Sequence, residues 1–211
     1  MVRPPRQPAS LSLKGTALLV LLLVAAPSFI LSCSQFRGDL AINSLGEARF
    51  SLKPDFRTVQ YKKRNANGVT IILSDLDAED IRNGRFSSGS VLIIDMFLRP
   101  KAGATPIEGT ATNATFRHVI FVNDDLVGIY GGGGFVYPTS KPSADSFSGE
   151  IFNSTLQIIQ KSDDFVDRLG SLEITGSVMA TRKEEEVTEM AYQINTEVSR
   201  RLGQVYFVLY D

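Results

Sequence analysis

The chain has 211 residues, a formal net charge of −1 at pH 7, one cysteine and one histidine. The single cysteine excludes an internal disulfide, and the single histidine excludes sites that need several imidazole ligands. The near-neutral, slightly acidic balance argues against nucleic acid as the main partner and provides no basic patch for anionic lipids.

The first 32 residues have the order of a secretory signal. Three basic residues and no acidic one precede the apolar run Ala17–Leu31. This run has about 15 residues, fewer than the roughly 20 that a helix needs to cross a bilayer, and Pro27 interrupts it. We therefore expect residues 1–32 to be a cleaved signal peptide rather than a membrane span.

The apolar run ends with Ile30-Leu31-Ser32-Cys33. This ending resembles the lipobox of bacterial lipoproteins, although Leu31 departs mildly from the small residue often found at its position. The resemblance covers only the leader and Cys33, and it implies cleavage before Cys33 and acylation of its thiol and amine. Two or more acyl chains would hold the protein stably on a membrane. The alternatives are an uncleaved signal anchor with an incidental cysteine, and cleavage elsewhere with Cys33 as a spare thiol.

The lipoprotein resemblance also implies a location and a layout. Residues 33–46 would be the lipidated N-terminus and a flexible tether, and residues 47–211 a single domain. Ser34 stands where an Asp resembles the inner-membrane retention signal of enteric bacteria. By this analogy we expect the outer membrane, facing the periplasm, in a Gram-negative source, and otherwise the outer face of the cytoplasmic membrane. The expected partners are the membrane, through the lipid on Cys33, and an envelope protein.

Alternation of apolar and polar residues predicts a domain rich in β-strands. A strand begins at Glu47, and the turn pair Asn67-Gly68 joins strands over 57–63 and 69–73. Further strands are predicted over residues 91–98, 110–122, 126–130, 135–137, 147–160 and 172–181.

Residues 74–84 raise the question of a calcium site. Asp75, Asp77 and Glu79 have the odd-numbered spacing of an EF-hand loop, but the glycine and the bidentate glutamate of such a loop are missing. A short helix with acids in its first turn and Gly84 after its end explains the pattern better. We therefore predict a helix and no metal or other cofactor.

Two polar residues lie among apolar ones in predicted strands. Asp95 interrupts the run 91–98, and because a lone buried carboxylate is costly, it needs a hydrogen-bond partner or a function as an acid. His118 shares a face with Phe116 and Ile120. We interpret it as a packed, hydrogen-bonded residue rather than a catalyst, because no nucleophile lies near it at a recognisable spacing.

Four consecutive glycines, Gly131–Gly134, lack the Lys-Ser/Thr ending of a phosphate-binding loop, and no amphipathic helix follows them. They predict either a mobile hairpin tip or a bulge where another backbone approaches closely. Around a mobile tip, Tyr130, Phe135 and Tyr137 would form a recognition surface.

The clearest helix covers about residues 181–203. It has a capping box that starts at Thr181, one apolar face at helical spacing, and Gly203 as its stop. The apolar run Gln204–Tyr210 predicts a final strand, which a right-handed crossover would place parallel to 172–181.

We expect a mainly β domain, an antiparallel-rich sandwich or partly open barrel with the C-terminal helix packed on it. The leading functional hypothesis is a lipid-anchored, exported protein whose β domain binds a ligand or supports an assembly. One alternative is an extracytoplasmic hydrolase that uses carboxylates such as Asp95, Asp124 or Asp125. The other is a carrier of a lipid or apolar ligand. Two close carboxylates in a deep pocket would favour the hydrolase, and an apolar cavity of several hundred Å³ would favour the carrier.

Overall fold

The computed structural model describes residues 38–46, 49–101, 111–141 and 144–209. In this part of the chain the strands form one nine-stranded sheet, on which two helices pack. The elements are β1 (Gly38–Ser44), β2 (Ser51–Leu52), β3 (Thr58–Lys63), β4 (Val69–Ser74), α2 (Ala78–Arg82), β5 (Gly89–Met96), β6 (Ala114–Val122), β7 (Leu126–Pro138), β8 (Ser146–Lys161), β9 (Leu172–Arg182) and α3 (Glu184–Leu202). The predicted mainly β class with a C-terminal helix is confirmed.

The sheet closes into a ring. Strands β3 to β9 pair antiparallel in sequence order, and β9 then pairs with β3. This last contact is parallel and consists of two residue pairs, Gln60 with Thr181 and Tyr61 with Arg182. We call it the seam. Strand β1 pairs with β9 beside the seam, and β2 adds two residue pairs to β1.

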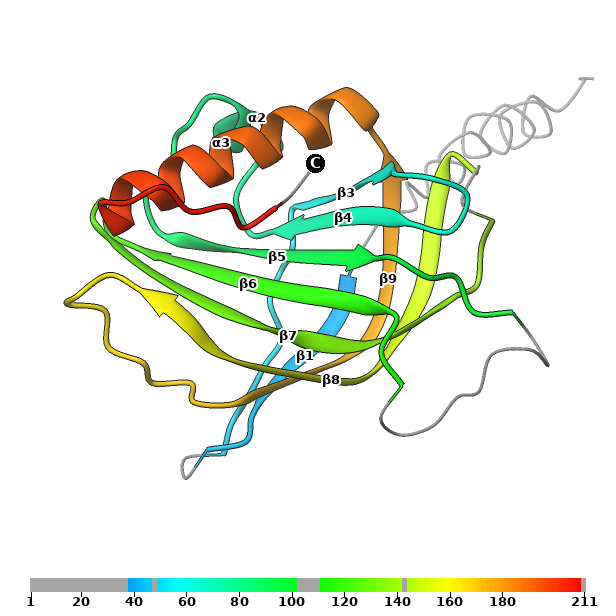
Figure 1. Ribbon diagram of the computed structural model, residues 1–211, viewed down its shortest axis with the longest axis horizontal. Helices are drawn as coiled ribbons and strands as arrows, with labels where there is room; N and C mark the ends of the chain where they lie inside the picture. Colours follow the sequence, from blue (N-terminus) through cyan, green and yellow to red (C-terminus); the bar gives the residue numbers. More distant parts are fainter. Residues whose placement is uncertain (1–37, 47–48, 102–110, 142–143, 210–211) are drawn as a thin grey trace, which may run out of the picture. The chain divides into compact units, whose positions relative to one another are not determined.

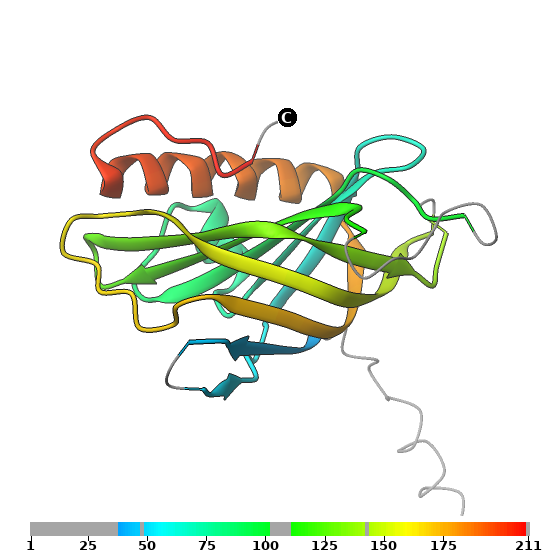
Figure 2. The ribbon, with the colours of Figure 1, turned by 60° about the horizontal axis from the view of Figure 1, so that its bottom comes forward.

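Two apolar layers hold the ring together. The inner core fills the ring and includes Tyr61, Phe116, Tyr130 and Phe147. The outer layer lies between α3 and the outward faces of β4 to β7. Figure 2 shows α3 and the pair β1–β2 on opposite sides of the ring. Because successive side chains of a strand point to opposite faces, β4 to β7 contribute to both layers.

Helix α3 lies across one wall of the ring (Figure 1). Its buried apolar residues recur at helical spacing, as predicted: Val187, Met190, Ala191, Ile194 and Val198. Each fully buried aliphatic side chain contributes about 1.5–3 kcal/mol relative to an exposed one, so this stripe is the main attachment of the helix.

The predicted capping box of α3 is wrong. The N-cap residue is Lys183, and it makes no side-chain capping hydrogen bond. Thr181 still belongs to β9, so its hydroxyl is too early to cap the helix. The Glu184 carboxylate instead accepts a hydrogen bond of 2.7 Å from Arg182 Nε. The other end agrees with the prediction, because Gly203 has a φ of 65°, a left-handed conformation that glycine adopts without strain.

A buried arginine fixes the last turn of α3. Arg201 Nε donates to Glu197 Oε1 at 2.6 Å. The two terminal nitrogens of Arg201 donate to the carbonyl oxygens of Phe86 (2.7 Å), Asn123 (2.7 Å) and Leu126 (2.9 Å). One side chain thereby joins α3 to the segment before β5 and to the β6–β7 turn.

The predicted final strand is wrong, because residues 204–209 form no strand. They lie along α3, where Asn195 Oδ1 accepts the N–H of Val208 at 2.8 Å. The Ser199 hydroxyl accepts the N–H of Tyr206 at 2.9 Å. Polar side chains of the helix thus replace a neighbouring strand as hydrogen-bond partners, and Val208 packs into the outer layer. The predicted parallel crossover is absent, and the parallel pair in the described sheet is the seam.

The predicted tether over 33–46 contains β1. Leu40 and Ile42 are buried in the inner core, as expected for an alternating strand. The strand predicted from Glu47 is reduced to the two exposed residues of β2. The ordered domain therefore includes Gly38, and residues 33–37 lie outside the described residues.

The four glycines lie inside β7, between β6 and β8, so the predicted hairpin tip is wrong. A Cβ atom on Gly132 would lie 1.8 Å from the Thr155 carbonyl oxygen, and one on Gly134 would lie 2.6 Å from Ser154 Cβ. The register of β7 against β8 shifts at this point. The other alternative, a bulge with close backbone approach, is therefore the correct one.

Candidate functional site

The connection between β8 and β9, residues 162–171, covers one end of the ring, and we call it the cap. Figure 1 shows it at the end that carries the β6–β7 turn. The Phe165 side chain of the cap is buried, and its ring fills the space above Gly128. A Cβ atom on Gly128 would lie only 2.2 Å from Phe165 Cζ, so the Phe165 ring fits there because Gly128 has no side chain.

A second contact fastens the cap to the inner wall. The Tyr130 hydroxyl donates to Asp167 Oδ1 at 2.6 Å, and the same oxygen accepts the N–H groups of Leu169 and Gly170, both at 3.0 Å. Burial raises the pKa of Asp167, but the bonds from Tyr130, Gly170 and Leu169 outweigh it and hold that pKa below its ordinary value. Burial, followed by the bond to Asp167, raises the pKa of Tyr130. The pair is therefore a phenol that donates to a carboxylate.

A pocket of about 350 Å³ lies between the cap and the walls of β6 and β7. We call it the mouth pocket. Its lining is mostly apolar and consists of Ile120, Val122, Leu126, Tyr130, Asp164, Phe165, Val166, Arg168 and Leu169. Its volume is within the range of about 300–1,000 Å³ for small-molecule sites.

The register of β6 and β7 places His118 beside Tyr130, the innermost lining residue of the mouth pocket. From the pocket inward, the pair Ile120–Gly128 is followed by the pair His118–Tyr130. Successive pairs on one face are two residues apart, which is about 7 Å along a strand. The His118 and Tyr130 rings have their centroids 6.4 Å apart.

The His118 imidazole is buried without a polar partner. Its exposed fraction is 3%, and neither Nδ1 nor Nε2 has a hydrogen-bond partner among the described residues. Burial lowers the pKa of His118 to about 4, so the ring is neutral at pH 7. The expected packing of His118 on an apolar face is confirmed, whereas the expected hydrogen bond is absent from the described part of the chain. Buried polar groups without a partner are rare and need an explanation.

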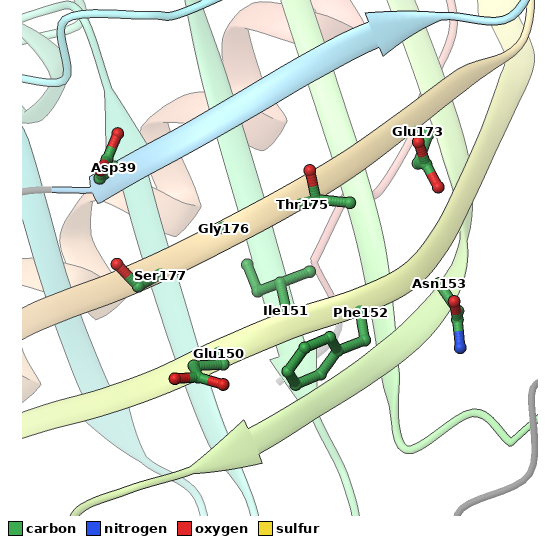
Figure 3. A pocket seen from close by; sticks show the side chains of 9 residues that line it. All are labelled: Asp39, Glu150, Ile151, Phe152, Asn153, Glu173, Thr175, Gly176 and Ser177. Atoms are coloured by element: carbon green, nitrogen blue, oxygen red, sulfur yellow. The ribbon is translucent and has the colours of Figure 1, made fainter.

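A second hollow, of about 390 Å³, lies on the outer face of β1, β8 and β9. Figure 3 shows Asp39, Glu150 and Glu173 at separate places around it, with Phe152 between strands β8 and β7. Asp39 and Glu150 are the register partners of Ser177 on its two sides. Their backbones are therefore two strand spacings apart, about 10 Å, on the two sides of β9.

Asp95 is a structural carboxylate. Its Oδ2 forms an ion pair with Arg64 at 2.8 Å, and its Oδ1 accepts the Thr70 hydroxyl at 2.8 Å. Both oxygens are thereby satisfied, as expected for a hydrogen-bonded Asp in an apolar run.

Asp124 and Asp125 are exposed in the β6–β7 turn. Asp125 lies 4.0 Å from Arg200 at its nearest contact, a distance at which an exposed pair contributes little. Asp95 pairs with Thr115, near the start of β6, whereas the turn follows the end of that strand. The three candidate carboxylates therefore do not form one site.

The predicted recognition surface is wrong. Tyr130 and Phe135 have exposed fractions of 0% and 3%, and only Tyr137, at 38%, reaches solvent. The cause is the position of the glycines, because a central strand buries the residues that flank them. Tyr130 instead belongs to the mouth pocket.

The acidic residues of the segment 74–84 have separate partners. Asp75 accepts the N–H of Ser90 at 2.7 Å, and Asp77 pairs with Arg57 at 3.6 Å. Helix α2 starts after Asp77, which occupies the N-cap position. In the described ranges of the chain, no three His, Cys, Asp or Glu residues are grouped closely enough to hold a metal ion.

The mouth pocket and the attachment of its cap depend on residues that the sequence did not indicate. Phe165 and Asp167 lie in a polar connection, and their partners Gly128 and Tyr130 are more than 30 residues away. The apolar pair Phe165-Val166 within an otherwise polar segment was the one available signal.

Cys33 and the leader lie outside the described residues. Within those residues, neither α2 nor α3 has the length and apolarity to span a bilayer. No protein-family model, curated protein or solved structure matches the chain.

Proposed function

We propose that the chain is an exported protein, anchored through a lipid on Cys33, whose β ring binds the apolar chain of a lipid-like ligand in the mouth pocket. The mouth pocket carries this proposal. Its apolar walls favour burial of hydrocarbon by about 25 cal/mol per Å² of apolar surface removed from water.

The cap supports the proposal because it can move without disruption of the sheet. It contains no helix or strand. Side-chain hydrogen bonds hold it at separate points: Tyr130 to Asp167 (2.6 Å), the N–H of Val127 to the Ser162 hydroxyl (3.0 Å), the Ser44 hydroxyl to the Leu169 carbonyl (2.7 Å) and Lys161 to the Phe165 carbonyl (2.8 Å). A connection held in this way can open without separation of any paired strands, which gives a ligand a route of entry.

The position of β1 is consistent with a ring held close to a membrane. Because Gly38 pairs with Val178 whereas Ser44 pairs with Leu172 beside the cap, the mouth pocket lies at the other end of β1 from Gly38. Strand β1 begins at Gly38, five positions after Cys33. Five residues span at most about 17 Å when fully extended. A lipid on Cys33 would therefore hold the ring next to the bilayer, where apolar ligands are concentrated.

A titration of the protein in nanodiscs with the fluorescent apolar probe N-phenyl-1-naphthylamine tests the pocket, with the signal of empty nanodiscs subtracted. We expect one saturable site per chain. The substitution Leu126→Gln adds a polar group to the half-buried lining, and we expect it to weaken probe binding about tenfold. The matched control is Leu98→Gln, because Leu98 is apolar and 44% exposed beyond the end of β5 and does not line the pocket. No saturable signal, or equal loss in both variants, would refute the pocket.

The anchor is tested separately through Cys33→Ala. We expect the mature wild-type protein to begin at residue 33, to carry acyl chains by mass spectrometry and to sediment with membranes, and the variant to lose all three properties. If the wild-type mass shows no acyl chains and the variant stays on the membrane, the lipoprotein part of the proposal is wrong. The ring part would stand unaffected.

A further inference from the structure

We propose that the mouth pocket extends, when the cap moves, past Tyr130 to His118, and that its ligand is a long-chain carboxylic acid whose carboxylate takes the place of Asp167. This inference rests on the proposed function and adds to it the chemistry of the headgroup and the orientation of the ligand.

The site already holds a carboxylate, namely that of the cap. The Tyr130 hydroxyl donates to Asp167 Oδ1 at 2.6 Å, a length typical of charge-assisted bonds. Because Asp167 belongs to the cap, movement of the cap leaves the Tyr130 hydroxyl without its acceptor in apolar surroundings, where an unpaired hydroxyl is costly. The carboxylate of a ligand would restore the bond.

His118 supplies a second donor at the same depth. It pairs with Tyr130 across β6 and β7, and the two rings lie 6.4 Å apart. A neutral imidazole carries one N–H, so it can donate to the second oxygen of a carboxylate without any transfer of a proton. Such a bond would give a role to a group that is 3% exposed and has no partner in the described residues.

Phe165 occupies the layer between the mouth pocket and His118. Its ring lies over Gly128, where no side chain competes for the space. Outward displacement of Phe165 would therefore free the volume of one aromatic ring and connect the pocket to the pair His118–Tyr130.

The order of polar and apolar groups determines the orientation of the ligand. The two polar groups are deepest, and Ile120, Val122 and Leu126 lie nearer the mouth. A ligand with its carboxylate at the inner end would accept hydrogen bonds from Tyr130 and His118, and its hydrocarbon chain would contact the apolar side chains nearer the mouth. The reverse orientation would leave both Tyr130 and His118 unpaired. A protonated alkyl amine has no acceptor for them, and an alcohol offers a single, uncharged oxygen.

The test compares palmitic acid with hexadecanol, which have the same chain length and differ in the headgroup, by displacement of the fluorescent probe from the full protein at pH 7. The readout is the ratio of the two affinities. We expect the wild-type protein to prefer the acid about tenfold, the effect of one charge-assisted hydrogen bond. In His118→Leu the ratio should fall toward one, and His118→Gln, which keeps an N–H donor, should recover part of it. Tyr192→Ser, on the exposed face of α3, is the control that should keep the wild-type ratio.

The outcomes separate this inference from the proposed function. Binding of neither compound refutes the proposed function. Equal binding of both by the wild-type protein, with the same ratio in His118→Leu and His118→Gln, leaves the apolar pocket standing and refutes the carboxylate. A further variant, Phe165→Ala, tests the depth. We expect palmitic acid to associate faster with this variant, because the ring no longer blocks the path to His118. Slower association and weaker binding would instead show that Phe165 contacts the bound ligand and does not block its entry.

Discussion

The two buried basic side chains of the described structure have opposite surroundings. Arg201, in the outer layer, donates to Glu197 and to backbone carbonyls of Phe86, Asn123 and Leu126, and it lies 4.8 Å from the centroid of the Phe121 ring. The His118 imidazole, in the inner core, has no hydrogen-bond partner within the described residues.

This difference separates a structural group from a candidate functional one. Arg201 has enough acceptors to explain its burial, because it joins three segments of the chain. The His118 imidazole forms no hydrogen bond that links two segments of the described structure. A leucine of similar size would pack in the same place without the cost of an unpaired polar group. The unsatisfied residue therefore points to a ligand, whereas the satisfied one explains the stability of the fold. The predictions below test this contrast.

The largest effect is expected for Arg201→Ala. The substitution leaves several buried carbonyls unpaired and removes one of the cations that stabilise the Glu197 carboxylate. Burial raises the pKa of Glu197, and the bonds from Arg200 and Arg201 outweigh it. Breaking such a buried pair costs about 3–5 kcal/mol of the free energy of unfolding, measurable by urea denaturation. Arg200→Ala is the control, since Arg200 is half-exposed and should cost at most about 1 kcal/mol. Equal losses in the two variants would contradict a special role for Arg201.

The second effect is the pH dependence of stability. The pKa of His118 is about 4 in the folded protein, against an ordinary value of 6.5, so the unfolded chain binds the proton more tightly. Stability from this group is present above pH 6.5 and is lost as the pH falls toward 4, a change of about 3 kcal/mol. His118→Leu should lack this part of the acid destabilisation when both proteins are unfolded with urea from pH 7 to pH 4. Parallel pH curves for the two proteins would show that His118 is not buried in its neutral form.

The smallest effect is expected for Tyr130→Phe, which removes the bond to Asp167 and leaves the ring in place. We expect a loss of about 1–2 kcal/mol in global stability. Amide hydrogen exchange should increase in the cap, at Leu169 and Gly170, more than in β6 or α3. If the exchange of the cap does not change, the Tyr130–Asp167 bond does not hold it closed.

The fold class could be predicted from the sequence because most helices and strands bury one face, and this burial gives a regular spacing of apolar residues. The spacing of Val187, Met190, Ile194 and Val198 made α3 recognisable, and alternation identified most of the long strands. The failures have physical reasons. The run after Gly203 has strand-like residues, but Asn195 and Ser199 of α3 satisfy its backbone. The segment 38–44 alternates as a strand does, yet its position after the leader favoured a tether.

The candidate site was less predictable than the fold. His118 and Tyr130 each drew attention by residue type, but their proximity depends on the register of β6 and β7. The contribution of Asp167 depends on a cap whose conformation no local pattern determines. Gly131–Gly134 misled for a related reason, because glycine at a turn and glycine under a close backbone contact look the same in sequence.

The seam has a consequence for how the chain folds. Its two residue pairs join β3 to β9, positions about 120 residues apart along the chain, whereas the other contacts around the ring join strands that follow one another in sequence. Long-range contacts are slow to form because a large loop must close first. The antiparallel meander can therefore assemble by successive hairpins before the ring closes. Closure at Gln60–Thr181 and Tyr61–Arg182 would come last, and the bond of 2.9 Å from the N–H of Lys183 to the Tyr61 carbonyl would form with it.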